Sequence, residues 1–170
     1  MDGFKEIPVE SLKINPFSMI RRETMLLTAG NRQKCNTMTA GWGTLGVLWN
    51  HDVSTVYVRP SRYTLEFLDR EPYYTLCFFG GGQRAALSYC GTHSGRDGDK
   101  IRAAGLTPVF DEAAPYFKEA RLVLVCRKLY RQALAPACFL DKSIDGASYP
   151  KKDYHIAFVG SIEKVLQAAA

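Results

Sequence analysis

Residues 58–64, Val-Arg-Pro-Ser-Arg-Tyr-Thr, place two arginines and two hydroxyls in one short stretch after a β-branched run. Ser61 is a good helix N-cap, so we expect the three residues that follow it to open a helix. A helix start presents free backbone N–H groups, and its dipole favours an anion. With charge-assisted bonds from Arg59 and Arg62, this stretch could hold a terminal monophosphate. Taken alone, a capped helix with two solvated arginines explains the same residues.

A second stretch, residues 36–43, reads Asn-Thr-Met-Thr-Ala-Gly-Trp-Gly. If it is extended, Thr37 and Thr39 share one face and Met38 takes the other. Hydroxyls and exposed backbone N–H groups could bond the polar edge of a planar heterocyclic ring. The glycines would let a flat ring approach the backbone, and the tryptophan could pack near it. A glycine-bulged strand with a buried methionine and tryptophan is the alternative.

The third stretch, residues 94–100, reads Ser-Gly-Arg-Asp-Gly-Asp-Lys. Asp97 or Asp99 could cap the helix that follows, with Arg96 and Lys100 near its start. Small polar residues and two basic side chains suit a loop that closes over a nucleotide. A capped loop with solvated charges is again the alternative.

Other chemistries have weaker support in the sequence. The Gly80-x-Gly82-x-x-Ala85 pattern matches a dinucleotide fingerprint formally, but another loop follows it where a second parallel strand should lie. Cys90-x-x-His93 lacks a second ligand pair at zinc-site spacing, so no metal site is predicted. Nothing local marks a catalytic cysteine.

The pattern of elements favours an antiparallel β-barrel with short helices packed outside, because the strands do not alternate regularly with long helices. Strands are expected at 25–28, 35–42, 53–58, 73–79, 121–130 and 154–166, and helices at 15–22, 61–70, 83–88 and 99–104. No linker divides the chain, so residues 1–170 are predicted to form a single domain.

Composition excludes some classes. With 46% apolar and 23% charged residues the chain is an ordinary globular one, and its net charge of +5 favours anionic partners. The basic residues form no run, so nucleic acid is not an expected partner. Five cysteines without a C-x-x-C pair indicate reduced thiols in the cytoplasm. No apolar stretch is long enough for a signal peptide or a membrane span.

In order and spacing, the three stretches resemble the flavin reductase-like, FMN-binding split-barrel proteins, which include flavoredoxin. The resemblance runs from about residue 14 to 162, and Asp153-Tyr154-His155 followed by Phe158-Val159-Gly160 is similar to the family's C-terminal strand. Two positions depart from the pattern: Gly41 stands where similar proteins often have serine, and the residues after Trp49 lack the expected prolines.

The resemblance implies an antiparallel Greek-key barrel, a homodimer, and FMN near the dimer interface. It implies that residues 36–39 run along the flavin ring, that Arg59, Ser61, Arg62 and Thr64 hold the phosphate, and that Lys100 and the Ser94-Gly95 loop close the site. The full set of cofactor-binding candidates is Asn36, Thr37, Met38, Thr39, Ala40, Gly41, Trp42, Val58, Arg59, Pro60, Ser61, Arg62, Tyr63, Thr64, Ser94, Gly95 and Lys100.

The cofactor would carry the redox chemistry, so no general acid or base is assigned. His155 and Tyr154 are candidates for shaping the nicotinamide side. Three functions remain open. They are an NAD(P)H-dependent flavin reductase, a flavoredoxin-type electron carrier that binds FMN without turning over a nicotinamide by itself, and a basic binding module without a cofactor. The electron acceptor would be a small molecule or a protein.

Overall fold

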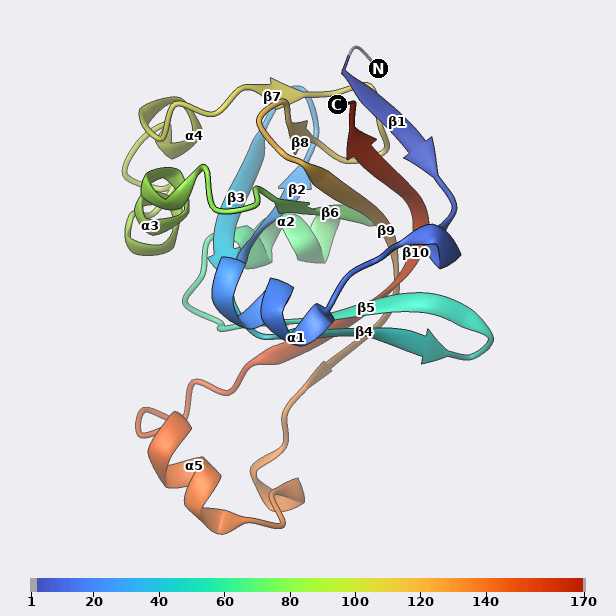
Figure 1. The fold of residues 1–170 in the computed structure, drawn as a ribbon. Helices are drawn as coiled ribbons and strands as arrows, with labels where there is room; N and C mark the ends of the chain where they lie inside the picture. The colour runs from blue at the N-terminus through green and yellow to red at the C-terminus, as the bar shows by residue number, and fades with distance from the viewer. Residues whose placement is uncertain (1–2, 170) are drawn as a thin grey trace.

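The computed structural model describes residues 3–169, and its main feature is one eight-stranded antiparallel sheet that curves around a core (Figure 1). The strand order is β3-β2-β6-β9-β10-β5-β4, with β1 pairing along β10. A separate two-stranded sheet pairs β7 with β8. The strands are β1 Phe4–Ile7, β2 Met25–Gly30, β3 Cys35–Ala40, β4 Gly43–Leu48, β5 His51–Val58, β6 Tyr73–Phe78, β7 Pro108–Val109, β8 Tyr116–Phe117, β9 Leu122–Ala133 and β10 Ile156–Ala168.

The helices are short and lie around this sheet. They are α1 Pro16–Ser18, α2 Thr64–Arg70, α3 Arg84–Thr92, α4 Lys100–Ala103 and α5 Lys142–Ser148, with a π-helical turn at Met19–Glu23 and 3-10 turns at Val9–Ser11 and Pro136–Cys138. Helices α3 and α4 lie beside β3, whereas α5 belongs to an arm between β9 and β10 that extends away from the sheet (Figure 1). Within residues 3–169, no helix is both long and apolar enough to cross a membrane.

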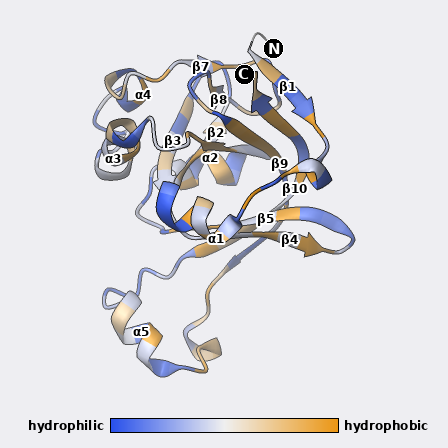
Figure 2. Cartoon of the chain, viewed as in Figure 1, coloured by the Kyte–Doolittle hydropathy of each residue, from blue (hydrophilic) through white to orange (hydrophobic). Residues whose placement is uncertain are grey.

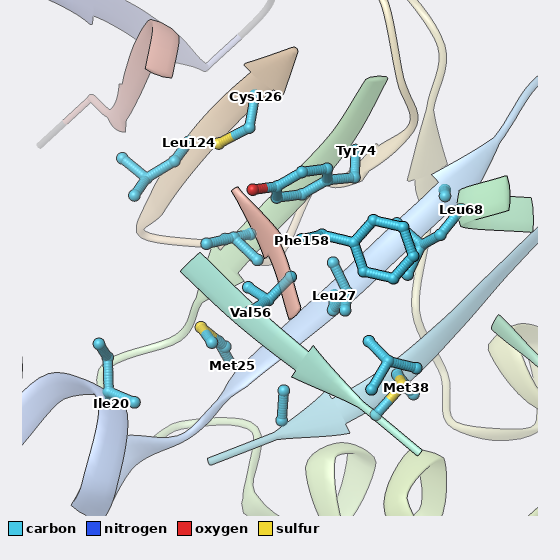
Figure 3. Packing of buried hydrophobic residues seen from close by; sticks show 14 of the residues in the cluster. Ile20, Met25, Leu27, Met38, Val56, Leu68, Tyr74, Leu124, Cys126 and Phe158 are labelled. Carbon is cyan, nitrogen blue, oxygen red and sulfur yellow. The ribbon is translucent and has the colours of Figure 1, made fainter. Parts of the chain in front are cut away.

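Alternation along the strands divides the apolar residues between two clusters. On β2, Leu27 packs with Tyr74 and Phe158 inside the barrel (Figure 3), while its neighbour Leu26 packs on the opposite face, with residues of α3 and α4. The first residues of β9 form a nearly continuous apolar run, which Figure 2 shows in orange. This run is buried on both faces of the sheet. Burial on both sides makes the centre of the sheet a rigid support for the loops at its edge.

The mainly β, antiparallel fold predicted from the sequence is confirmed. Each predicted strand is present, β9 and β10 are longer at one end than expected, and Asn15 caps α1 by accepting a bond from the Ser18 N–H at 3.1 Å. The sequence interpretation missed β1, β4, the short strands β7 and β8, and α5. Residues 1, 2 and 170 of the predicted single domain lie outside the described residues.

Gly160 gives a stability prediction. It lies at a bulge of β10, and a Cβ added there would stand 2.5 Å from the hydroxyl oxygen of buried Tyr74, which also bonds Ser54. Overpacking of this kind costs about 1–3 kcal/mol, so Gly160→Ala should lower the thermal midpoint by roughly 3–10 °C. Gly146→Ala in α5 is the control, because an added Cβ meets nothing within 4 Å there. Equal midpoints for the two variants, measured by thermal unfolding, would refute the prediction.

Candidate functional site

Two small cavities adjoin where β3 faces the turn after β5. The first, here called the lysine cavity, has a volume of about 210 Å3. The second, the histidine cavity, has a volume of about 190 Å3. Met38, Arg59 and Arg62 line both, so the two cavities adjoin and together make up the candidate site. The lysine cavity is completed by Ser61, Tyr63, Thr64, Thr92, His93, Ser94 and Lys100, and the histidine cavity by Thr39, Ala40, Gly41, Trp42, Tyr57 and His155.

Lys100 is the most unusual group in the lysine cavity, because its side chain is only 6% exposed. Its ammonium donates to the backbone oxygens of Cys90 at 3.2 Å and His93 at 3.1 Å. Among residues 3–169, no carboxylate lies within ion-pair distance of it. Burial lowers the pKa of Lys100, and the nearby Arg62 guanidinium lowers it further. A buried cation without a counter-ion is costly unless an anion joins it.

The two arginines of the turn, which look alike in the sequence, have different surroundings. Arg59 pairs with the Asp153 carboxylate at 2.6 Å and donates to the Ser148 oxygen at 3.0 Å, so it ties the arm to the barrel. Arg62 donates to the Gly91 oxygen at 2.8 Å and has no carboxylate partner in the described part of the chain. Arg62 and Lys100 therefore present two uncompensated cations to the lysine cavity.

The predicted helix start at Ser61 is wrong. A turn closes with the Arg62 N–H bonding the Arg59 oxygen at 3.0 Å, and α2 begins only at Thr64. Tyr63 is the N-cap, without a side-chain bond, and the helix has seven residues. The Thr64 hydroxyl accepts from the buried Asn36 amide at 2.8 Å, and this tertiary bond fixes the helix start against β3. The positive charge that could bind an anion here is thus that of side chains and not that of a helix N-terminus.

Strand β3 supplies the wall of the site. It is an edge strand that pairs only with β2, so its outer backbone groups have no strand partner in the described sheet. The Thr37 hydroxyl is turned away, toward Thr28 at 2.8 Å, and the Thr39 hydroxyl donates to the Leu87 oxygen of α3. The cavities therefore face Met38 and the free backbone edge, which can bond a planar heterocycle.

His155 is held at the far end of the histidine cavity and is 8% exposed. Its Nδ1 bonds the Tyr149 hydroxyl at 2.9 Å, and its ring lies 4.8 Å from the Trp42 ring centre. The pKa of His155 is lowered to about 4, chiefly by burial and then by Arg59 and Arg62, while Asp153 acts in the opposite direction. The imidazole is therefore neutral at neutral pH.

The loop before α4 covers one side of the lysine cavity. Arg96 pairs with Glu66 of α2 at 2.6 Å and lies 4.6 Å over the Tyr63 ring, so the loop is fastened to α2. A Cβ on Gly95 would stand 2.1 Å from the Asn36 side-chain oxygen, which shows how closely the loop packs on β3. The predicted cap at Asp99 is confirmed, since its carboxylate accepts the Arg102 N–H at 3.1 Å.

Most of the residues singled out in the sequence gather here. Met38, Thr39, Ala40, Gly41, Trp42, Arg59, Ser61, Arg62, Tyr63, Thr64, Ser94 and Lys100 line the two cavities. Asn36 and Gly95 line a neighbouring, wider cavity. Thr37 and Val58 are fully buried, and Pro60 is exposed in the turn. Tyr154 lies outside the site, where its hydroxyl donates to Asp145 at 2.7 Å. The sequence prediction missed Tyr57, Thr92 and His93 of the cavity linings and Tyr149 beside His155, for which no local motif gives a signal.

The lowered pKa of His155 predicts a pH dependence of stability. The unfolded chain takes up this proton near its ordinary value of 6.5, but the folded chain only near 4. The contribution of neutral His155 to the free energy of unfolding is thus fully present above pH 6.5 and is lost as the pH falls toward 4. In that window the unfolding free energy of wild type should fall more steeply than that of His155→Gln, by up to about 1.4 kcal/mol per pH unit.

Denaturant unfolding of both proteins across this pH range measures the difference. Hydrogen bonds from their partners hold the pKa values of Asp145 and Asp153 below 3.8, so these carboxylates titrate below this window, and both proteins contain them. Parallel curves for the two proteins would mean that His155 is protonated as readily in the folded chain as in the unfolded one.

The chain is similar to known proteins along nearly all its length. A family model described as the flavin reductase like domain matches residues 17–169. A solved flavoredoxin from Methanosarcina acetivorans is 27% identical, with a TM-score of 0.64 over 92% of this chain and 75% of that one. No curated protein matches the sequence.

Two further solved structures, at lower identity, share the fold. An FMN-binding domain of a flavin reductases-like enzyme from Shewanella baltica gives a TM-score of 0.70 at 14% identity, over 99% of this chain and 79% of that one. An NADH:FAD oxidoreductase from Streptomyces globisporus, in complex with NAD and FAD fragments, gives 0.64 at 18% identity, over 85% of this chain and 74% of that one.

Proposed function

The chain belongs to the flavin reductase-like domain family, and from this membership we propose that it binds FMN and passes electrons from NAD(P)H to an acceptor. The observation that carries the proposal is the buried Lys100 ammonium, which has no carboxylate partner among the described residues and shares its cavity with Arg62. A terminal phosphate dianion supplies the missing negative charge. The cavity is also continuous with a strand edge suited to a flat ring.

In this proposal each part of the site has its own task. Lys100 and Arg62 bind the phosphate, with Ser61 and Ser94 as further hydrogen-bonding groups in the same cavity. Met38 and the outer edge of β3 orient the ring. FMN, when bound, supplies the hydride and electron transfer at its ring system. No residue of the site is assigned as a general acid or base.

Residues of the histidine cavity bound the space in which a nicotinamide would meet the ring. Trp42 and neutral His155 pack against each other there with their rings tilted by 39°, and the Tyr149 hydroxyl fixes the orientation of the imidazole. Arg59 is a positioning residue, because its guanidinium is already paired with Asp153. These groups shape the space through which a nicotinamide would reach the flavin ring and limit the water in that space.

A flavoredoxin-type electron carrier is the second candidate, favoured by the 27% identity to the flavoredoxin from Methanosarcina acetivorans. A carrier would bind FMN equally well but would exchange electrons with a partner protein. Anaerobic mixing with NADH or NADPH separates the two candidates. Rapid loss of the oxidised flavin absorbance supports the reductase, whereas an unchanged spectrum that a strong chemical reductant then bleaches supports the carrier.

The absorbance spectrum and flavin affinities of the purified protein test the cofactor. We expect a yellow protein, or an apoprotein that binds FMN, with FMN bound more tightly than riboflavin because riboflavin lacks the phosphate. Equal affinity for the two flavins would contradict the phosphate site. A protein that binds neither flavin would leave only the basic binding module.

We also propose a homodimer with the flavin near its interface. An apolar groove of about 860 Å3 runs between the arm, α1 and β4, next to the histidine cavity. Phe17, Trp42 and Ile144 line it and are 83%, 48% and 44% exposed. Exposed apolar area of this kind favours a partner surface. Sedimentation should give about twice the chain mass of 19.0 kDa, and a monomer with FMN bound would contradict an interface site.

The proposed setting is the reducing cytoplasm. All five cysteines are free thiols, and Cys77, Cys90 and Cys126 are buried. Burial raises the pKa of Cys77 and of Cys126 to about 12, so these thiols are protonated and unreactive.

A further inference from the structure

The two cations of the lysine cavity are both bonded to the carbonyl end of α3. In the last turn of a helix the backbone oxygens lack intrahelical donors and take other partners. Here the Gly91 oxygen accepts from the Arg62 guanidinium at 2.8 Å. The Cys90 oxygen accepts from the Lys100 ammonium at 3.2 Å, and so does the oxygen of His93, where the helix ends, at 3.1 Å. The end of α3 therefore holds both side chains that the proposed function assigns to the phosphate.

This arrangement makes the position of α3 a part of the phosphate site. The carbonyl end of a helix carries partial negative charge, so it orients a cation without cancelling its full charge. Within residues 3–169 neither Arg62 nor Lys100 has a carboxylate in ion-pair distance, and the oxygens of α3 are among their few hydrogen-bond acceptors. Where these oxygens lie therefore decides where the two charges lie.

Thr39 is the residue that ties α3 to the wall of the site. Its hydroxyl donates to the Leu87 oxygen of α3, and within residues 3–169 no other hydrogen bond joins β3 to this helix. The two elements lie side by side (Figure 1), and a Cβ added to Gly91 would stand 3.4 Å from the Thr39 Cβ. A change at Thr39 therefore reaches the end of α3 directly.

The same bond limits what the Thr39 hydroxyl can do toward a flavin. A hydroxyl has one proton to donate, and here the Leu87 oxygen takes it, so the group has none left for an acceptor atom of the ring. We propose that Thr39 is a positioning residue for the phosphate, which acts through α3 on Arg62 and Lys100, and that its hydroxyl is not a donor to the ring. This inference rests on the proposed function, because it needs the phosphate at those two cations.

Thr39→Val tests the proposal, because valine keeps the branched shape and removes the hydroxyl. Calorimetry measures the affinities of the variant and of wild type for FMN and for riboflavin. We expect FMN binding to weaken about three- to tenfold, as for the loss of one hydrogen bond, and riboflavin binding by less than about twofold. Thr39→Ser keeps the hydroxyl and should restore the wild-type ratio of the two affinities.

Thr75→Val is the matched control. Thr75 is also a strand residue whose hydroxyl donates to a backbone oxygen of another segment, that of Pro115 at 2.5 Å, but it lines neither cavity. Its replacement should lower the thermal midpoint and leave both flavin affinities unchanged. A merely structural effect of losing a buried hydroxyl bond would thus appear in both valine variants, whereas a changed ratio of FMN to riboflavin affinity should appear only in Thr39→Val.

Hydrogen exchange of the wild-type protein gives a second readout that needs no variant. A bound phosphate should hold Arg62 and Lys100 in place against the carbonyl end of α3. Amide exchange in residues 89–93 should therefore slow by about threefold or more with saturating FMN, and by clearly less with saturating riboflavin. Equal protection by the two flavins would contradict a link between the phosphate and α3.

The remaining outcomes separate this inference from the proposed function. Equal losses of FMN and riboflavin affinity in Thr39→Val would mean that the hydroxyl serves the ring, and unchanged affinities would mean that α3 keeps its place without Thr39. Either result overturns the positioning role while wild type still prefers FMN to riboflavin. If wild type binds the two flavins equally, or binds neither, the proposed phosphate site fails together with this inference.

Discussion

Lys100→Met should abolish tight FMN binding and leave the protein folded. The ammonium is buried and, within residues 3–169, bonds two backbone oxygens and no carboxylate, so FMN would supply an anion to it. Without Lys100 the phosphate dianion would enter a cavity that has lost one of its two uncompensated cations. Removal of one partner from a buried charge pair costs about 2–5 kcal/mol, which is roughly a thirtyfold to several-thousandfold loss of affinity.

Stability should respond differently from affinity. The variant loses two hydrogen bonds to carbonyl groups, but it also removes a buried charge that lacks a counter-ion in the described chain, and these two effects oppose each other. The thermal midpoint without FMN should therefore move by only a few degrees, while the increase that FMN causes in wild type should disappear. Thermal unfolding with and without FMN measures both quantities.

Lys128→Met is the matched control for Lys100→Met. Lys128 is also partly buried, burial lowers its pKa, and its ammonium donates to the Leu68 backbone oxygen, but it lines neither cavity. Its replacement should leave the FMN affinity close to that of wild type. A Lys100→Met protein that binds FMN within about threefold of wild type would show that the phosphate lies elsewhere.

The sequence predicts the parts of the fold that local patterns determine. The β-branched and apolar runs of β5 and β9 mark strands unambiguously, and Asn15-Pro16 marks a helix start. Strand β4 escaped detection because its two glycines interrupt the alternation, and only pairing with β5 makes it a strand. Helix α5 contains glycine and serines of low helix propensity, and it depends on the cap at Asp141.

The site is predictable to the extent that residues of its three stretches come together in space, as Met38, Arg62 and Lys100 do around the lysine cavity. The sequence could not separate the roles of Arg59 and Arg62. Their difference comes from Asp153, which is 94 positions from Arg59 in the chain and pairs with it only after β10 has docked beside β5. The helix start was misplaced for the same reason, because the bond between Asn36 and Thr64 is a tertiary contact.

Arg62→Ala should weaken FMN binding by about ten- to a hundredfold, the value of one charge-assisted bond to a phosphate. Riboflavin binding should change by less than about threefold, because riboflavin has no phosphate to lose the contact. The guanidinium is partly exposed and donates to a single backbone oxygen, that of Gly91, so stability without flavin should hardly change. Titration of both flavins into wild type and variant gives the two ratios.

Arg59→Ala separates a phosphate contact from a positioning role. This substitution leaves Asp153 without its partner and frees the arm at Ser148, so it should lower the thermal midpoint. It should also weaken FMN and riboflavin by similar factors, because a displaced arm affects the ring side of the site and not the phosphate. The ratio of FMN to riboflavin affinity should therefore fall in Arg62→Ala and stay near the wild-type value in Arg59→Ala. The reverse pattern would assign the phosphate to Arg59 and would require its bond to Asp153 to break when flavin binds.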